Sequence, residues 1–153
     1  MTGATSRIRV LSVDDHPLLR SGIGALIGTQ PDMQLVAEAS TGREAVQVHR
    51  EMKPDVTLMD LQMPDLNGVE AIKAIRDEAP KARIVVLTTY AGDAQALRAL
   101  KAGAAGYLLK SSLRKDLLET IRNVHAGRRH LQPEVATEIA MHAIDEPDRK
   151  SVV

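Results

Sequence analysis

Short apolar runs rich in β-branched residues alternate along the chain with longer segments of helical periodicity. Five of the runs have the length of strands, and they cover Ile8–Val13, Met33–Ala39, Val56–Met59, Arg83–Thr88 and Gly106–Leu109. Regular alternation of strands and helices predicts an α/β fold, in which helices cover a parallel sheet on both faces.

The segments between these strands repeat apolar residues three and four positions apart, which is the spacing of one helical face. The predicted faces are Leu19, Ile23, Leu26 and Ile27; Ala45, Val48 and Met52; Val69, Ile72 and Ile75; and Leu117, Ile121 and Val124. A further helix, with a weaker Ala-rich face, is expected from Asp93 to Ala102. Each strand is therefore followed by a helix.

Helix ends are also marked in the sequence. Thr41 with Glu44 has the capping-box pattern, and Asn67 with Glu70 is a weaker version of it. Gly127 is a plausible C-terminal stop for the last of these helices.

The length of 153 residues and the hydrophobic content of 44% suit one domain. We assign residues 1–130 to this domain and residues 131–153 to an added segment. Within that segment, apolar spacing predicts an extra helix from Pro133 to about Ile144, and Asp145–Val153 has the composition of a linker.

Composition excludes several function classes. Lys and Arg together number 20, and Asp and Glu together also number 20. The chain therefore lacks the excess of basic residues that is typical of a domain that binds nucleic-acid phosphates. The absence of cysteine excludes disulfides, a Cys-based zinc site and a thiol nucleophile. No apolar run has the length of a signal peptide or a membrane span, so we expect a cytoplasmic protein without membrane contact.

Polar residues that carry chemistry follow four of the five strands. Asp14 and Asp15 follow the first strand, Asp60 the third, Thr88 ends the fourth and Lys110 follows the fifth. Ligands of open parallel sheets bind at this carboxyl edge. Three neighbouring carboxylates repel one another unless a hard cation shares the site, and Mg²⁺ prefers oxygen ligands. We expect Asp15 and Asp60 to bind Mg²⁺, with Asp14 orienting a bound water.

Such a site suits phosphoryl transfer. With the metal screening its charge, Asp60 can attack a phosphoryl donor and form an acyl phosphate. The metal and Lys110 would neutralise the oxygens of the transferred group, and the Thr88 hydroxyl could bond one of them.

These positions resemble the receiver domain of bacterial response regulators, and the resemblance extends to about Ala143. It rests on Val13–Pro17, Leu58–Pro64 with Asn67 and Gly68, Leu87–Tyr90 and Gly106–Lys110. It implies a flavodoxin-like, doubly wound (βα)5 fold with the strand order 2-1-3-4-5. It also implies phosphorylation at Asp60, Mg²⁺ bound by Asp15, Asp60 and the backbone carbonyl of Gln62, a Thr88–Tyr107 switch pair, and phosphate contact by Lys110.

Asp15–Arg20 together with Leu131–Ala136 is most similar to the NarL/FixJ branch of this family. Members of this branch carry a LuxR-type helix-turn-helix domain after a linker and regulate transcription. The resemblance implies a sensor histidine kinase as phosphoryl donor and DNA binding only through an output domain that this chain lacks. We expect phosphorylation to alter the face made by the fourth helix, fifth strand and fifth helix, and to promote homodimerisation.

One position departs from the family pattern. Many receivers have proline after the phosphate-contacting lysine, joined by a cis bond, whereas Ser111 follows Lys110 here. A cis bond before a non-proline residue costs about 2.5–4 kcal/mol, so the sequence leaves the isomer open.

Other readings compete with a phosphoacceptor. An aspartate-nucleophile phosphohydrolase usually has a second Asp two residues after the nucleophile, where this chain has Gln62, and no Walker-type nucleotide loop occurs. A phosphorylation-independent pseudo-receiver would typically lack an acidic-pair residue or the lysine, and both are present. We therefore expect a signalling domain rather than an enzyme, with at most intrinsic self-phosphorylation and self-dephosphorylation.

Two residues have ordinary structural explanations. His16, which precedes Pro17, is expected to be structural or solvent-facing rather than catalytic. Tyr107, taken alone, is expected to be a partly buried core residue whose hydroxyl contacts water.

Overall fold

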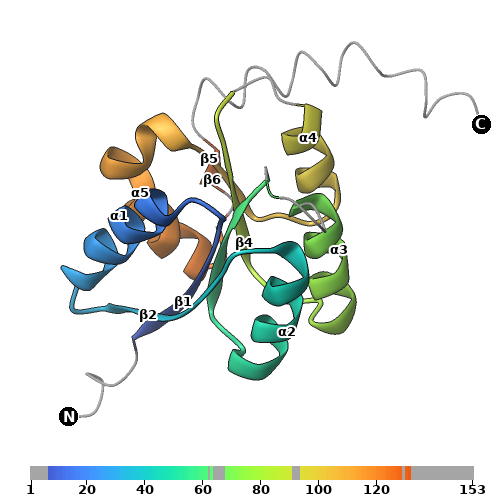
Figure 1. The fold of residues 1–153 in the computed structure, drawn as a ribbon, viewed down its shortest axis with the longest axis horizontal. Coiled ribbons are helices and arrows are strands. Elements are labelled where there is room, and N and C mark those ends of the chain that lie inside the picture. Colours follow the sequence, from blue (N-terminus) through green and yellow to red (C-terminus); the bar gives the residue numbers. More distant parts are fainter. Residues whose placement is uncertain (1–6, 62, 64–67, 91–93, 129, 132–153) are drawn as a thin grey trace, which may run out of the picture.

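The computed structural model describes residues 7–61, 63, 68–90, 94–128 and 130–131, which form a parallel sheet between two layers of helices (Figure 1). The strands are β1 (Ile8–Val13), β2 (Met33–Ala39), β3 (Val56–Asp60), β4 (Ile84–Thr88), β5 (Gly106–Leu109) and β6 (His130–Leu131). The helices are α1 (Pro17–Gly28), α2 (Gly42–Met52), α3 (Gly68–Glu78), α4 (Ala94–Lys101) and α5 (Leu113–His125), with a 3₁₀ turn at Lys110–Ser112. The predicted α/β alternation is confirmed.

The sheet has the strand order β2-β1-β3-β4-β5-β6, and all neighbouring strands are parallel. The expected order 2-1-3-4-5 is therefore confirmed for the first five strands. The sixth strand was not predicted. It adds two residues to the outer edge of β5, where Gly106 pairs with His130 and Tyr107 with Leu131. A strand of two residues is too short to produce a recognisable sequence pattern.

Both faces of the sheet are buried, which explains why the central strands are almost wholly apolar. Helices α2, α3 and α4 cover one face, and α1 and α5 cover the other (Figure 1). Leu11, Met59 and Val86 belong to the core of the first face, and Val10, Leu58 and Val85 to the core of the second. All five residues of β3 and of β4 are buried. This rigid sheet holds the residues at its carboxyl edge in place.

The predicted helix ends agree with the structure wherever it describes them. The Thr41 hydroxyl accepts a hydrogen bond from the Glu44 N–H at 3.1 Å, as a capping box requires. The Glu44 carboxylate, however, accepts from the Ser40 N–H at 2.8 Å rather than from Thr41. Gly127 has φ 89° and its N–H donates to Val124 O, so it ends α5 as expected.

Several expectations fall outside the described residues. These are the cap at Asn67, the start of the fourth helix at Asp93, the metal-binding carbonyl of Gln62, and the extra helix and linker over 133–153. Among the helices that the structure does describe, none is long and apolar enough to cross a membrane.

Candidate functional site

Strand pairing brings the predicted site residues to one edge of the sheet. Val13, which precedes Asp14 and Asp15, pairs with Met59, which precedes Asp60. On the other side of β3, Asp60 pairs with Leu87, and Thr88 pairs with Leu109, the residue before Lys110. Because all strands are parallel, each one delivers its carboxyl-terminal residue to the same rim.

Asp60 and Lys110 form the centre of the site. The Asp60 side chain is fully buried, and the Lys110 Nζ donates to Asp60 Oδ2 at 3.1 Å. The lysine side chain is 18% exposed, so one end of the pair is open to solvent. A buried carboxylate is costly unless it is paired, and the lysine supplies the opposite charge. The predicted proximity of Lys110 to Asp60 is confirmed.

Asp14 is buried beside this pair. Its Oδ1 accepts a hydrogen bond from the His16 N–H at 2.8 Å, while its Oδ2 is buried and has no hydrogen-bond partner among the described residues. Burial raises the pKa of the Asp14 carboxyl, the His16 N–H opposes that rise, and the neighbouring charge of Asp60 adds to it. The site therefore holds an acidic group whose negative charge the protein compensates only in part.

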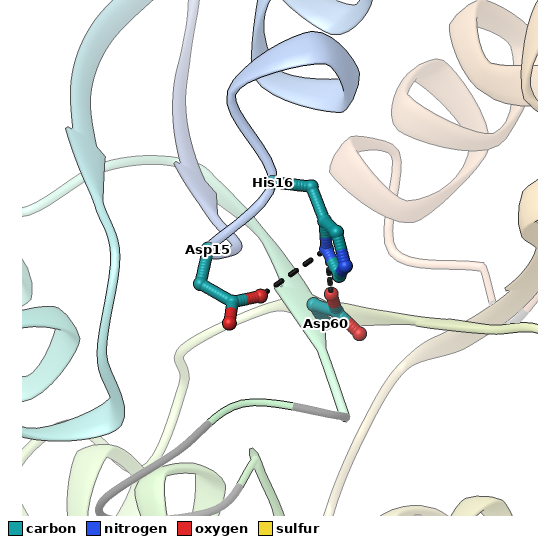
Figure 2. Close-up of side chains that lie close together, drawn as sticks. All are labelled: Asp15, His16 and Asp60. Atoms are coloured by element: carbon teal, nitrogen blue, oxygen red, sulfur yellow. Dashed lines mark ion pairs between the residues drawn. The ribbon is translucent and has the colours of Figure 1, made fainter.

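His16, which is expected from the sequence to be structural or solvent-facing, is exposed but also lies beside the carboxylates of Asp15 and Asp60. Figure 2 shows its imidazole between Asp15 and Asp60, with Nδ1 3.1 Å from Asp15 Oδ1 and 3.7 Å from Asp60 Oδ2. The side chain is 58% exposed, but it points toward the carboxylates rather than away from them. Its position directly after Asp14 and Asp15 is the signal that could have identified it.

The donor set fits a divalent cation. One oxygen each from Asp15 and Asp60 and a nitrogen of His16 lie within 4.8 Å of one another. Asp14 Oδ2 is buried without a hydrogen-bond partner in the described part of the chain, and the buried Asp15 Oδ1 has the His16 imidazole beside it. Buried carboxylate oxygens without donors are the arrangement that a hard cation stabilises. Asp14, Asp15 and Asp60 thus fit the Mg²⁺ that the sequence predicts.

Thr88 and Tyr107 lie on neighbouring strands and are both fully buried. The Tyr107 hydroxyl donates to the backbone carbonyl of Tyr90 at 2.9 Å, so the expectation of a partly buried ring with a wet hydroxyl is wrong. Tyr107 packs with the core under α2, α3 and α4, while the side chain of Tyr90 is 67% exposed. The tyrosine is therefore tied to the loop that follows Thr88.

The peptide bond between Lys110 and Ser111 is trans. The structure thus decides the question that the sequence left open. The two residues begin the 3₁₀ turn that leads from β5 into α5.

An open groove of about 810 Å³ runs along α1 and α5 and reaches the site. Leu19 and Ile23 of α1 and Leu113 of α5 line its apolar part, and His16 and Lys110 line it as well. The groove therefore reaches Lys110, the residue that contacts Asp60.

Comparison with known proteins agrees with this geometry. The model of the response regulator receiver domain family matches residues 10–122. Response regulator protein VraR of Staphylococcus aureus is 39% identical over 132 residues, which are 86% of this chain and 63% of the relative. The chain thus spans less than two thirds of the length of the curated relatives that it matches.

Solved structures give the same result. A LuxR-family two-component response regulator from Aurantimonas sp. SI85-9A1 is 42% identical, with a TM-score of 0.84 over 91% of this chain and 99% of that one. The signal receiver domain of the putative response regulator NarL from Mycobacterium tuberculosis is 32% identical, with a TM-score of 0.76 over 80% and 99%. The chain therefore belongs to the response regulator receiver family, as a receiver domain of a LuxR-family two-component response regulator.

Proposed function

We propose that this receiver takes a phosphoryl group on Asp60 from a sensor histidine kinase. The observation that carries the proposal is the contact of 3.1 Å between Lys110 Nζ and Oδ2 of the fully buried Asp60, beside the carboxylates of Asp14 and Asp15. Capping or solvation of acidic residues at strand ends would account for Asp14 and Asp15, but not for a lysine aimed at Asp60.

In the transfer step, a carboxylate oxygen of Asp60 attacks the phosphorus of the donor. The bond from phosphorus to the leaving nitrogen of the kinase histidine breaks, and that nitrogen keeps the electron pair. Lys110 stabilises the negative charge on the phosphoryl oxygens, and the hydroxyl of Thr88 donates to one of them. Asp15, Asp60 and the carbonyl of Gln62 would hold Mg²⁺, which supplies positive charge to the same oxygens. Asp14 would orient a water at this site.

An acyl phosphate at Asp60 carries roughly two negative charges where the carboxylate carried one. Movement of Thr88 toward the phosphoryl group would change the packing between β4 and β5, where Tyr107 and its bond to Tyr90 lie. The equilibrium between two conformations of the face made by α4, β5 and α5 then shifts. β6, which pairs with β5, lies at the edge of this face. This shift would act on the segment 131–153 and on a helix-turn-helix output domain beyond it, and so on transcription.

The partners follow from this assignment. The chain acts in the cytoplasm as a phosphoacceptor rather than as an enzyme, with intrinsic self-phosphorylation and self-dephosphorylation at most. DNA binding belongs to the output domain, which agrees with the balance of 20 basic and 20 acidic residues here. Phosphorylation promotes a homodimer. Sedimentation with and without beryllofluoride tests this point, and equal molecular weights in both conditions would contradict it.

The main experiment uses intact mass. Wild type and Asp60→Asn are incubated with acetyl phosphate in the presence and absence of Mg²⁺. We expect wild type with Mg²⁺ to gain the mass of one phosphoryl group and Asp60→Asn to gain none. An unmodified wild type that is still folded, by circular dichroism, would favour a phosphorylation-independent docking module. An Asp60→Asn variant that is still modified would place the phosphoryl group elsewhere.

A further inference from the structure

We infer that His16 supplies a nitrogen ligand to the dication site, so that this receiver binds first-row transition dications more tightly, relative to Mg²⁺, than carboxylate oxygens alone would allow. The inference rests on the dication site of the proposed function and adds a ligand to it. Its starting point is the placement of the imidazole between Asp15 and Asp60 (Figure 2).

The distances agree with ligands that share one metal. Two donor atoms each about 2.1 Å from a metal are about 3.0 Å apart at a right angle and about 3.4 Å apart at a tetrahedral angle. His16 Nδ1 lies 3.1 Å from Asp15 Oδ1 and 3.7 Å from Asp60 Oδ2. The two separations that involve Nδ1 therefore lie within a few tenths of an ångström of those between ligands that share one metal.

A second observation points to a cation at the same place. Asp14 is fully buried, and its Oδ2 has no hydrogen-bond donor among the described residues. Lys110 contacts Asp60 Oδ2 at the same place. The buried Oδ2 of Asp14 therefore leaves the site an oxygen acceptor for a cation.

The local backbone presents the imidazole to the site. The His16 N–H donates to Asp14 Oδ1 at 2.8 Å, and Pro17 begins α1 directly after it. A proline in the first helical turn has a fixed φ, which restricts the direction in which the chain leaves His16. The side chain is 58% exposed, so the imidazole lies at the solvent edge of the site. His16 therefore combines a constrained backbone with a side chain open to solvent.

Nitrogen changes which metals the site prefers. Mg²⁺ binds oxygen ligands almost exclusively, whereas imidazole suits Zn²⁺, Ni²⁺ and Cu²⁺, and affinities of N/O sites rise from Mn²⁺ toward Cu²⁺. A site of carboxylates alone would discriminate less among these ions. His16 thus gives the site a preference for transition dications over Mg²⁺ that the acidic residues do not provide.

The decisive measurement is pulsed EPR of stoichiometric Mn²⁺ on the full chain, because it detects a ¹⁴N nucleus bound to the metal. We expect a directly coordinated nitrogen in wild type and none in His16→Ala or in His16→Phe, which keeps a ring without nitrogen. His125→Ala is the matched control, because His125 is an exposed histidine at the end of α5, and its nitrogen signal should equal that of wild type. Asp15→Asn should weaken Mn²⁺ binding, as a shared site requires.

Affinity gives an independent readout. Loss of the ligand should weaken Mn²⁺ binding by roughly tenfold or more and Mg²⁺ binding by less. The dissociation constant for Mg²⁺ divided by that for Mn²⁺ should therefore fall. Absence of a ¹⁴N coupling in wild type would overturn the inference, and so would a coupling that survives in both His16 variants. Failure of wild type to be phosphorylated would count against the proposed function instead, even where the nitrogen coupling is present.

Discussion

The hydroxyl of the fully buried Tyr107 donates a hydrogen bond of 2.9 Å to the backbone carbonyl of Tyr90, whose own side chain is exposed. This bond joins β5 to the segment that directly follows Thr88, the last residue of β4. The bond therefore makes the position of the Tyr107 side chain depend on that segment, as the proposed Thr88–Tyr107 switch requires.

Tyr107→Phe removes the bond and leaves the ring in place. We expect the free energy of unfolding to fall by about 1 kcal/mol, because the Tyr90 carbonyl loses its donor. Urea unfolding measures the change. Tyr90→Phe is the matched control, since its backbone carbonyl is retained, and its stability should stay within about 0.5 kcal/mol of wild type. Equal losses in the two variants would show that the bond carries none of the effect.

Lys110→Gln keeps a polar side chain but removes the positive charge from Asp60. We expect the rate of phosphorylation by acetyl phosphate to fall by about 10²-fold or more, because the charge on the transferred oxygens loses a preorganised partner. The rate is followed by intact mass against time. Lys115→Gln, on the exposed surface of α5, should phosphorylate like wild type. A Lys110→Gln rate within a factor of two or so of that control would remove Lys110 from the mechanism.

Gly68 packs directly against the end of β3, which carries Asp60. A Cβ at this position would lie 2.8 Å from the carbonyl oxygen of Asp60 and 2.9 Å from Leu61 Cα, so the backbone would have to move. We expect Gly68→Ala to lower the free energy of unfolding by about 1–3 kcal/mol and to slow phosphorylation at Asp60. Chemical denaturation and the mass assay measure the two effects.

Gly22→Ala provides the control for that substitution. Gly22 is an exposed residue of α1, and a Cβ there would meet nothing within 4 Å. Alanine favours a helix interior over glycine by about 0.5–1 kcal/mol, so stability should rise rather than fall. A loss of similar size in both variants would mean that contact with Asp60 is not the cause.

His49 makes stability depend on pH. Burial lowers its pKa below the ordinary value of 6.5, and the charge of Glu78 opposes this shift. Arg50, Lys53 and Lys81 line the same cavity. As the pH falls below 6.5, His49 therefore binds a proton more readily in the unfolded chain than in the folded chain. The stability that the neutral side chain contributes is lost as the pH falls from 6.5 to the lower pKa of the folded state.

Replacing His49 should remove this dependence. Between pH 7.5 and about 5, the free energy of unfolding should fall less steeply for His49→Gln than for wild type. The slope is obtained from urea unfolding at several pH values. His125→Gln changes an exposed histidine and should keep the wild-type slope. A His49→Gln slope equal to that of wild type would assign the pH dependence to other groups.

Much of the fold could be predicted because its signals are local. The ranges of β1, β2 and β5 agree with the sequence prediction, and β3 and β4 differ from it only by one residue at one end. Thr41 caps the start of α2 and Gly127 follows the end of α5, as the sequence indicates. Burial on both faces of the sheet makes these strands continuous apolar runs, which short windows of sequence detect.

The tertiary structure alone decided the features that depend on side-chain direction or on distant pairing. It turned His16 toward Asp15 and Asp60, bonded the Tyr107 hydroxyl to Tyr90, and paired β6 with the edge of β5. The sequence by itself determined the first five strands, the helical segments between them and the charged residues at the strand ends. Periodicity and residue type report on neighbours along the chain, whereas the orientation of a ring or the docking of a two-residue strand depends on elements that meet only after folding.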